Sequence, residues 1–88
     1  MALVRLRGPL KKLAGNRSDH TIEASSVVEL LRELERAQPA VSGWIIDERG
    51  HIRQHINVFV NGERAREGAS VGPGDQIEVL PAISGGEQ

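Results

Sequence analysis

Apolar and polar residues alternate along several short stretches of the chain, with the period of two residues that is typical of a half-buried β-strand. The stretches at 2–7, 19–24, 55–61 and 76–81 follow this pattern, and a shorter strand is expected near 63–66. The residues predicted to face inward are Ala2, Val4, Leu6, His20, Ile22, Ala24, Ile56, Val58, Val60, Ile77 and Val79. Asn61-Gly62 lies between two of these strands and is a strong signal for a tight hairpin turn.

The apolar period changes to that of a helix between Ser26 and Gln38. Ser26 with Glu29 three residues later matches a capping box, and Pro39 ends the helix. The apolar positions at i, i+3, i+4 and i+7 are Val27, Leu30, Leu31 and Leu34. We interpret the charged residues around the rest of the helix as solvent-facing; they are Glu29, Arg32, Glu33, Glu35 and Arg36.

Two connections are harder to assign. Gly8-Pro9 ends the first strand, and 9–17 is predicted to be a loop before the second strand. Residues 40–50 are too apolar for a free loop, and we expect a short helical turn that closes one end of the core. The apolar residues of that segment are Val41, Trp44, Ile45 and Ile46.

The order of elements is two strands, a helix, a short connection and three strands. Such an order allows the helix to cover one face of a mixed sheet whose first and last strands lie side by side. The predicted fold class is therefore α+β, a β-grasp (ubiquitin-like) fold with a sheet of four to five strands. We predict a domain at 1–82 and a flexible C-terminal tail at 83–88. On the outer face, Phe59 and Leu80 would form an exposed apolar patch if their strands are neighbours.

Composition excludes several functional classes. The chain has 88 residues, a formal net charge of −1 and no cysteine. It therefore lacks the basic surface that binds nucleic acid or membranes, and it offers no disulfide or thiolate site. No stretch approaches the ~20 apolar residues of a membrane span, so we expect a cytoplasmic protein. His51 and His55 share no helical face, and we predict neither a metal site nor a bound cofactor.

The tail contains the pair Gly85-Gly86. Two residues without Cβ atoms can pass through a channel too narrow for any other pair, which would bring a main-chain carboxylate to the active site of another enzyme. Glycines near the end of a chain also occur simply because they are flexible. The glycine pair therefore indicates a function only in combination with the predicted fold.

With the segments 26–38, 55–62 and 74–86, the sequence resembles the MoaD/ThiS family of ubiquitin-like sulfur carrier proteins. The ending Leu80-Pro81-Ala82-Ile83-Ser84-Gly85-Gly86 is the most specific part of the resemblance. The middle segment, His55-Ile56-Asn57-Val58-Phe59-Val60-Asn61-Gly62, is nearest to members that serve cysteine biosynthesis. The resemblance implies a protein that is itself no enzyme: an adenylyltransferase similar to the ubiquitin-activating enzyme uses ATP to adenylate its terminal glycine. Sulfur then displaces the nucleotide, and the resulting thiocarboxylate donates sulfur to a biosynthetic enzyme.

Carried over to this chain, the resemblance implies that Gly86 is the acylated residue. It implies that Ile83, Ser84 and Gly85 thread into the partner enzyme. The residues expected to contact the partner are Phe59, Leu80, Pro81 and Ile83.

The chain departs from the family pattern at its last two residues, Glu87 and Gln88, which follow the glycine pair. In similar proteins with such an extension, a JAMM-type zinc metalloprotease removes it, and we expect cleavage here between Gly86 and Glu87. Two other readings remain open: a ubiquitin-like modifier ligated to lysines through Gly86, and a plain binding module. The residues do not indicate which pathway receives the sulfur, or whether trimming is constitutive or regulated.

Overall fold

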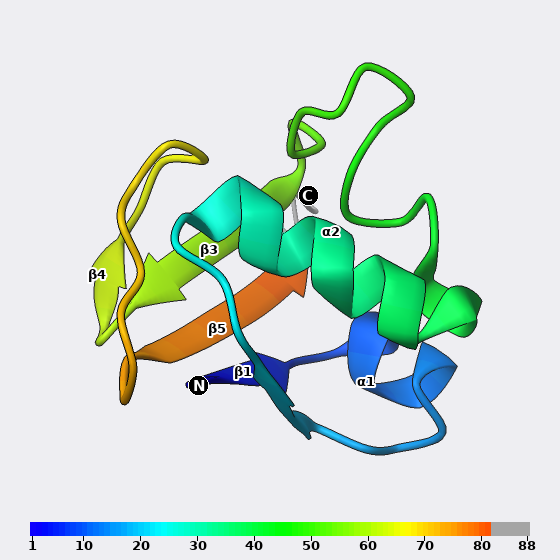
Figure 1. Ribbon diagram of the computed structural model, residues 1–88. Helices are drawn as coiled ribbons and strands as arrows, with labels where there is room; N and C mark the ends of the chain where they lie inside the picture. Colours follow the sequence, from blue (N-terminus) through cyan, green and yellow to red (C-terminus); the bar gives the residue numbers. More distant parts are fainter. Residues whose placement is uncertain (82–88) are drawn as a thin grey trace.

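The computed structural model describes residues 1–81, which form a mixed sheet with a long helix packed against one face (Figure 1). The order of the five strands in this part of the chain is β2-β1-β5-β3-β4. The strands are β1 (Ala2–Leu6), β2 (Asp19–Ile22), β3 (Ile56–Val60), β4 (Glu63–Arg64) and β5 (Gln76–Pro81). The helices are α1 (Pro9–Leu13), α2 (Val27–Ala37) and the 3-10 turn η1 (Pro39–Val41).

The first and last strands lie side by side, as predicted. β1 pairs in parallel with β5, with Val4 opposite Ile77, and β3 runs antiparallel on the other side of β5. Each end of the sheet is a hairpin, β1 with β2 and β3 with β4. In the second hairpin Asn61 and Gly62 have φ angles of 52° and 86°, and two successive positive φ angles give the turn whose twist matches its strands. The predicted β-grasp class is confirmed.

The helix α2 begins where the capping pattern predicts, with Ser26 as its N-cap. The Ser26 hydroxyl accepts a hydrogen bond from the Glu29 N–H at 3.3 Å. The Glu29 carboxylate accepts from the N–H of Ser25 at 2.8 Å, one residue earlier than in a regular capping box. α2 has 11 residues, and no helix in the described part of the chain is long and apolar enough to cross a membrane.

The core lies between α2 and the inner face of the sheet, and it is aliphatic. Of the positions predicted to face inward, only Ala24 and Val60 are less than fully buried. His20 is the buried polar residue of the described chain, 6% exposed, and its Nε2 lies 3.1 Å from the carbonyl oxygen of Arg17. The residues of the core that are essentially inaccessible are Val4, Leu6, Leu10, Val27, Leu30, Leu31, Leu34, Val41, Ile45, Ile77 and Val79.

The segment 9–17 was predicted to be a loop, and this prediction is wrong in part. Pro9–Leu13 forms the short helix α1, whose Leu10 is 1% exposed and belongs to the core. Pro9 occupies the first turn, where its missing N–H costs no helical hydrogen bond. Five residues are too few for a helical period to appear in the sequence, and the burial of Leu10 depends on the neighbouring sheet.

The segment 40–50 begins with the predicted helical turn, η1, and its Val41, Ile45 and Ile46 are buried. Trp44 differs from these neighbours because it is 51% exposed. The segment therefore contributes Val41, Ile45 and Ile46 to the core, and Trp44 lies at the surface. The rest of the segment forms a loop beyond α2 that returns to β3 (Figure 1).

Candidate functional site

The candidate site is the C-terminal end of β5, from which the Gly-Gly tail continues. Pro81, the last residue of the strand, is paired with Ile56 of β3. On the other side, the N–H of Arg7 donates to the carbonyl oxygen of Val79 at 3.0 Å. A side chain at Gly8 would lie 3.9 Å from Cδ of Pro81, so the backbone before α1 also borders this strand end. The tail therefore starts from a fixed point between two neighbouring segments of chain.

Phe59 and Leu80 lie on the outer face of the sheet, opposite α2, and their strands are neighbours as the prediction required. In the register of β3 and β5, Phe59 is opposite Glu78 and Leu80 is opposite Asn57. Phe59 and Leu80 are therefore diagonal neighbours, a spacing that aromatic and long side chains can bridge. Both are half-buried, and with Arg7, Gly62 and Glu78 they line a shallow depression of about 450 Å³.

A charged pair borders this depression. The guanidinium of Arg7 donates to Oε2 of Glu78 twice, from Nη2 at 2.7 Å and from Nε at 3.1 Å. A second pair on the same face joins Arg5 to Asp19 at 3.4 Å. Such exposed pairs contribute little to stability, about 0–1 kcal/mol each. An apolar centre with a polar rim is the usual composition of a protein-binding surface.

The residues assigned to the tail itself, Ile83, Ser84, Gly85, Gly86 and Glu87, lie outside the described residues. The same is true of Gln88 and of the domain boundary placed after residue 82. Their assigned roles stay predictions. Of the four residues expected to contact a partner, the structure describes Phe59, Leu80 and Pro81. It places Phe59 and Leu80 together on the outer face, whereas Pro81 follows Leu80 and belongs, by the alternation of the strand, to the same face as Val79.

Glu35 has a structural role that the sequence did not indicate. It was interpreted as solvent-facing, but Oε2 of its carboxylate accepts hydrogen bonds from two consecutive N–H groups, those of Ile45 at 3.0 Å and Ile46 at 2.9 Å. These bonds fix the loop that carries Trp44 to the side of α2. No local pattern reports such a contact, because its partners lie 10 and 11 residues further along the chain.

The far part of the same loop is held by hydrogen bonds to charged side chains. Nδ1 of His51 lies 2.8 Å from Oε1 of Glu67, and the other oxygen of that carboxylate accepts from the Ile52 N–H at 3.0 Å. The bond from His51 lowers the pKa of Glu67. The backbone N–H of His51, with a smaller effect from that of Arg49, lowers the pKa of Asp47.

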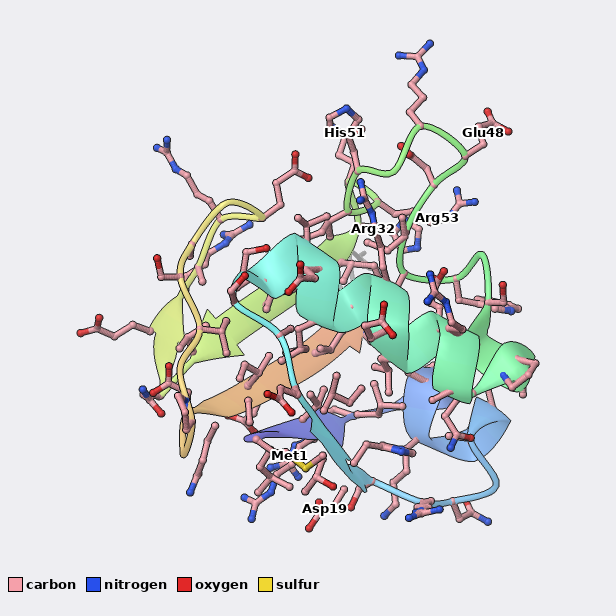
Figure 2. All side chains as sticks on the ribbon, viewed as in Figure 1. Met1, Asp19, Arg32, Glu48, His51 and Arg53 are labelled. Atoms are coloured by element: carbon pink, nitrogen blue, oxygen red, sulfur yellow. The ribbon has the colours of Figure 1, made fainter. Side chains whose placement is uncertain are left out.

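Arg32 reaches from α2 toward this loop, and its Nη2 donates to the carbonyl oxygen of Gly50 at 3.1 Å (Figure 2). His51 is thus part of a structural contact. Within residues 1–81, no group of three or more His, Cys, Asp or Glu side chains is placed to hold a metal ion.

Comparison with known proteins identifies the family to which this chain belongs. Residues 4–86 match the ThiS family, and the chain belongs to that family of small ubiquitin-like carrier and modifier proteins. The matched residues include Gly85 and Gly86.

Individual relatives agree with this assignment. Small archaeal modifier protein 1 of Haloferax volcanii is 32% identical over 84 residues, which cover 93% of this chain and 97% of that protein. A crystal structure of the same Haloferax protein superimposes with a TM-score of 0.80 at 28% identity, covering 93% of this chain and 97% of the other. The BexX/CysO complex of Amycolatopsis orientalis contains a chain with a TM-score of 0.83 at 23% identity, covering 96% and 98%, a likeness that concerns the fold.

Proposed function

We propose that this protein is a sulfur carrier that transports sulfur as a thiocarboxylate on Gly86. The observation that carries the proposal is the match to the ThiS family through Gly86, on a chain whose last described strand reaches Pro81, five residues earlier. Membership of the family supports the general role of a carrier or modifier.

The chemistry requires no catalytic side chain in this protein. The Gly86 carboxylate attacks the α-phosphorus of ATP and releases pyrophosphate, which forms an acyl-adenylate. Sulfide attacks the acyl carbon and AMP leaves, so that a thiocarboxylate remains. Its sulfur then attacks an electrophilic carbon of a substrate held by a sulfur-accepting biosynthetic enzyme, for cysteine or another thio-metabolite, and displaces the leaving group of that substrate. Hydrolysis of the acyl–sulfur bond releases the sulfur-bearing product and returns Gly86 as a carboxylate. ATP is bound by the adenylyltransferase, and the carrier needs no cofactor of its own.

The fold supports this role because the reactive tail and the surface that an enzyme could recognise are different parts of the protein that lie close together. Phe59 and Leu80 lie on the face opposite α2, next to the strand end at Pro81. An enzyme that receives the tail can therefore contact this patch at the same time. We propose that Phe59, Leu80, Pro81 and Ile83 form the contact with the adenylyltransferase.

Glu87 and Gln88 must be removed before Gly86 can be activated, because its carboxyl group is otherwise part of a peptide bond. We propose that a JAMM-type metalloprotease hydrolyses the bond between Gly86 and Glu87. The extension would then keep the carrier inactive until it is cleaved.

Mass spectrometry of the protein purified from its own host tests both steps. We expect a species that lacks the mass of the last two residues, and a second species heavier than it by the mass difference between sulfur and oxygen. A population that keeps Glu87 and Gln88 while the sulfur-dependent pathway operates would contradict the proposal.

A variant at the reactive residue separates activation from folding. Gly86→Ala should fold normally and should not be adenylated, because a Cβ at this position does not fit a channel built for glycine. Gly68→Ala is the matched control, since it makes the same substitution at an exposed glycine with open space around it and leaves the tail unchanged. Adenylation of a trimmed Gly86→Ala chain at the normal rate would count against the carrier.

A second candidate function is a protein modifier ligated to target lysines through Gly86. It is favoured by one observation, the name of the 32% identical relative, a small archaeal modifier protein. Adducts of higher mass that survive thiol reductant, with the tail joined to lysine, would support this function. The two lysines of the chain, Lys11 and Lys12, both lie in α1, so any chain formed by self-ligation would use that helix.

A further inference from the structure

Trp44 is the only tryptophan of the chain, and it is 51% exposed. Met1, at 67%, is the other large apolar residue that residues 1–81 expose to this extent. A single exposed apolar residue is common on protein surfaces and needs no explanation by itself. The backbone around Trp44 and its position in the fold distinguish it from such a residue.

The backbone that presents Trp44 is held from both sides. Its own N–H donates to the carbonyl oxygen of Val41 at 3.0 Å, and Nε of Arg53 donates to the carbonyl oxygen of Gly43 at 2.6 Å. On the other side, the N–H groups of Ile45 and Ile46 are bound by Glu35. Ile45 is fully buried directly beside the exposed indole. A side chain on a backbone already ordered in this way loses less conformational entropy when it binds a partner.

The surface around Trp44 borders the strand end from which the tail continues. Trp44, Gly43, Arg53 and His55 line a depression of about 320 Å³. His55 directly precedes Ile56, the residue paired with Pro81. Figure 2 shows Arg53 in the loop beyond α2, which leads directly into β3.

The distance from Pro81 to Gly86 determines what can cover this depression. Five residues of fully extended chain span at most about 17 Å. Any active site that receives Gly86 must therefore lie within that distance of Pro81, and the body of the enzyme must cover the surface around the strand end. Phe59 and Leu80 account for the outer face of the sheet, and the Trp44 depression lies on the loop that leads into the neighbouring strand.

We propose that Trp44 is a second point of contact for the adenylyltransferase that activates Gly86. The inference rests on the proposed function, and it names this enzyme because both the carrier and the modifier need activation of Gly86. The contact surface on the enzyme is an apolar pocket that accepts an indole. A carboxylate at its edge would pair with Arg53, whose terminal Nη groups make no hydrogen bond or ion pair to a protein atom within residues 1–81.

The test is ATP–pyrophosphate exchange by the adenylyltransferase, with the carrier ending at Gly86 as the varied substrate. Loss of an interface aromatic that binds a pocket typically costs a factor of about 30 in affinity. We therefore expect Trp44→Ala to raise KM about 30-fold with kcat unchanged, which is the signature of lost binding. Trp44→Phe should recover most of the loss. Leu3 is an apolar residue of β1 that lies beside the opposite end of β5. Leu3→Ala should keep KM within about twofold of that of the unmodified chain, as expected for a residue outside the interface.

Each other outcome of this test overturns the inference. If the KM of Trp44→Ala stays within about twofold of that of the unmodified chain, as expected for a residue outside the interface, the inference is wrong. The proposed function is not affected by this result. A loss of kcat alone also overturns the inference. Slower trimming of Trp44→Ala with normal exchange assigns this surface to the protease instead. If the unmodified trimmed chain supports no exchange, the proposed function and the inference fail together.

Discussion

Replacing Glu35 by alanine would remove the acceptor that holds the Trp44 loop against α2. In the structure one carboxylate oxygen accepts from the N–H of Ile45 at 3.0 Å and from that of Ile46 at 2.9 Å. Both isoleucine side chains are buried, so these N–H groups cannot turn outward without exposing part of the core. The substitution therefore leaves two donors without a partner in a half-buried position.

The magnitude follows from those two donors. A buried polar group left without a hydrogen bond costs about 1–3 kcal/mol. Since water can reach a half-buried position, the lower part of that range applies to each donor, and we expect a loss of about 2–4 kcal/mol in the free energy of unfolding. For a domain of this size each kcal/mol lowers Tm by about 4–8 °C, so Tm should fall by about 8–32 °C.

Urea denaturation of the full chain, followed by circular dichroism, measures this loss. Glu33→Ala is the matched control: Glu33 is also half-buried on α2, but its contact is an ion pair with Arg36 at 3.4 Å. Loss of that pair should cost at most about 1 kcal/mol. If Glu35→Ala destabilises the protein no more than Glu33→Ala does, the two hydrogen bonds do not hold the loop against α2.

Three further predictions concern the core, the loop and the response to acid. Leu30→Asp should abolish the cooperative unfolding transition, because Leu30 is 0% exposed and a charge there has no partner. Gly50→Ala should cost about 1–2 kcal/mol by thermal denaturation, since its φ is +86° and its Cβ would lie 2.6 Å from a guanidinium nitrogen of α2, whereas Gly68→Ala should change stability little. The hydrogen bond from His51 lowers the pKa of Glu67 in the folded state, so its stabilisation is complete above the unfolded value of about 4.5 and lost as the pH falls through the lower folded pKa. In Glu67→Gln, urea denaturation should show a smaller decline in stability over that acidic range, and a decline equal to that of the unmodified chain would contradict this.

Elements whose pattern is local could be predicted from the sequence. Alternating residues specified β1, β3 and β5, and the stripe of Val27, Leu30, Leu31 and Leu34 specified α2 with its cap at Ser26. Asn61-Gly62 specified the hairpin between β3 and β4, because two residues that tolerate positive φ are what that turn requires. The glycine pair of the tail is likewise visible only as sequence, and the family match includes it.

Features whose partners are distant along the chain depend on how the elements pack against one another. The short helix α1 depends on Leu10 entering a core built by other segments, and the exposure of Trp44 depends on which of four neighbouring apolar residues faces the core. The contact of Glu35 joins residues 10 and 11 positions apart, and no periodicity in α2 marks it. Periodicity shows which face of an element is apolar. It does not show which residues of different elements come into contact, because those contacts depend on how the elements pack. Contacts of this kind form both the patch beside Pro81 and the surface around Trp44.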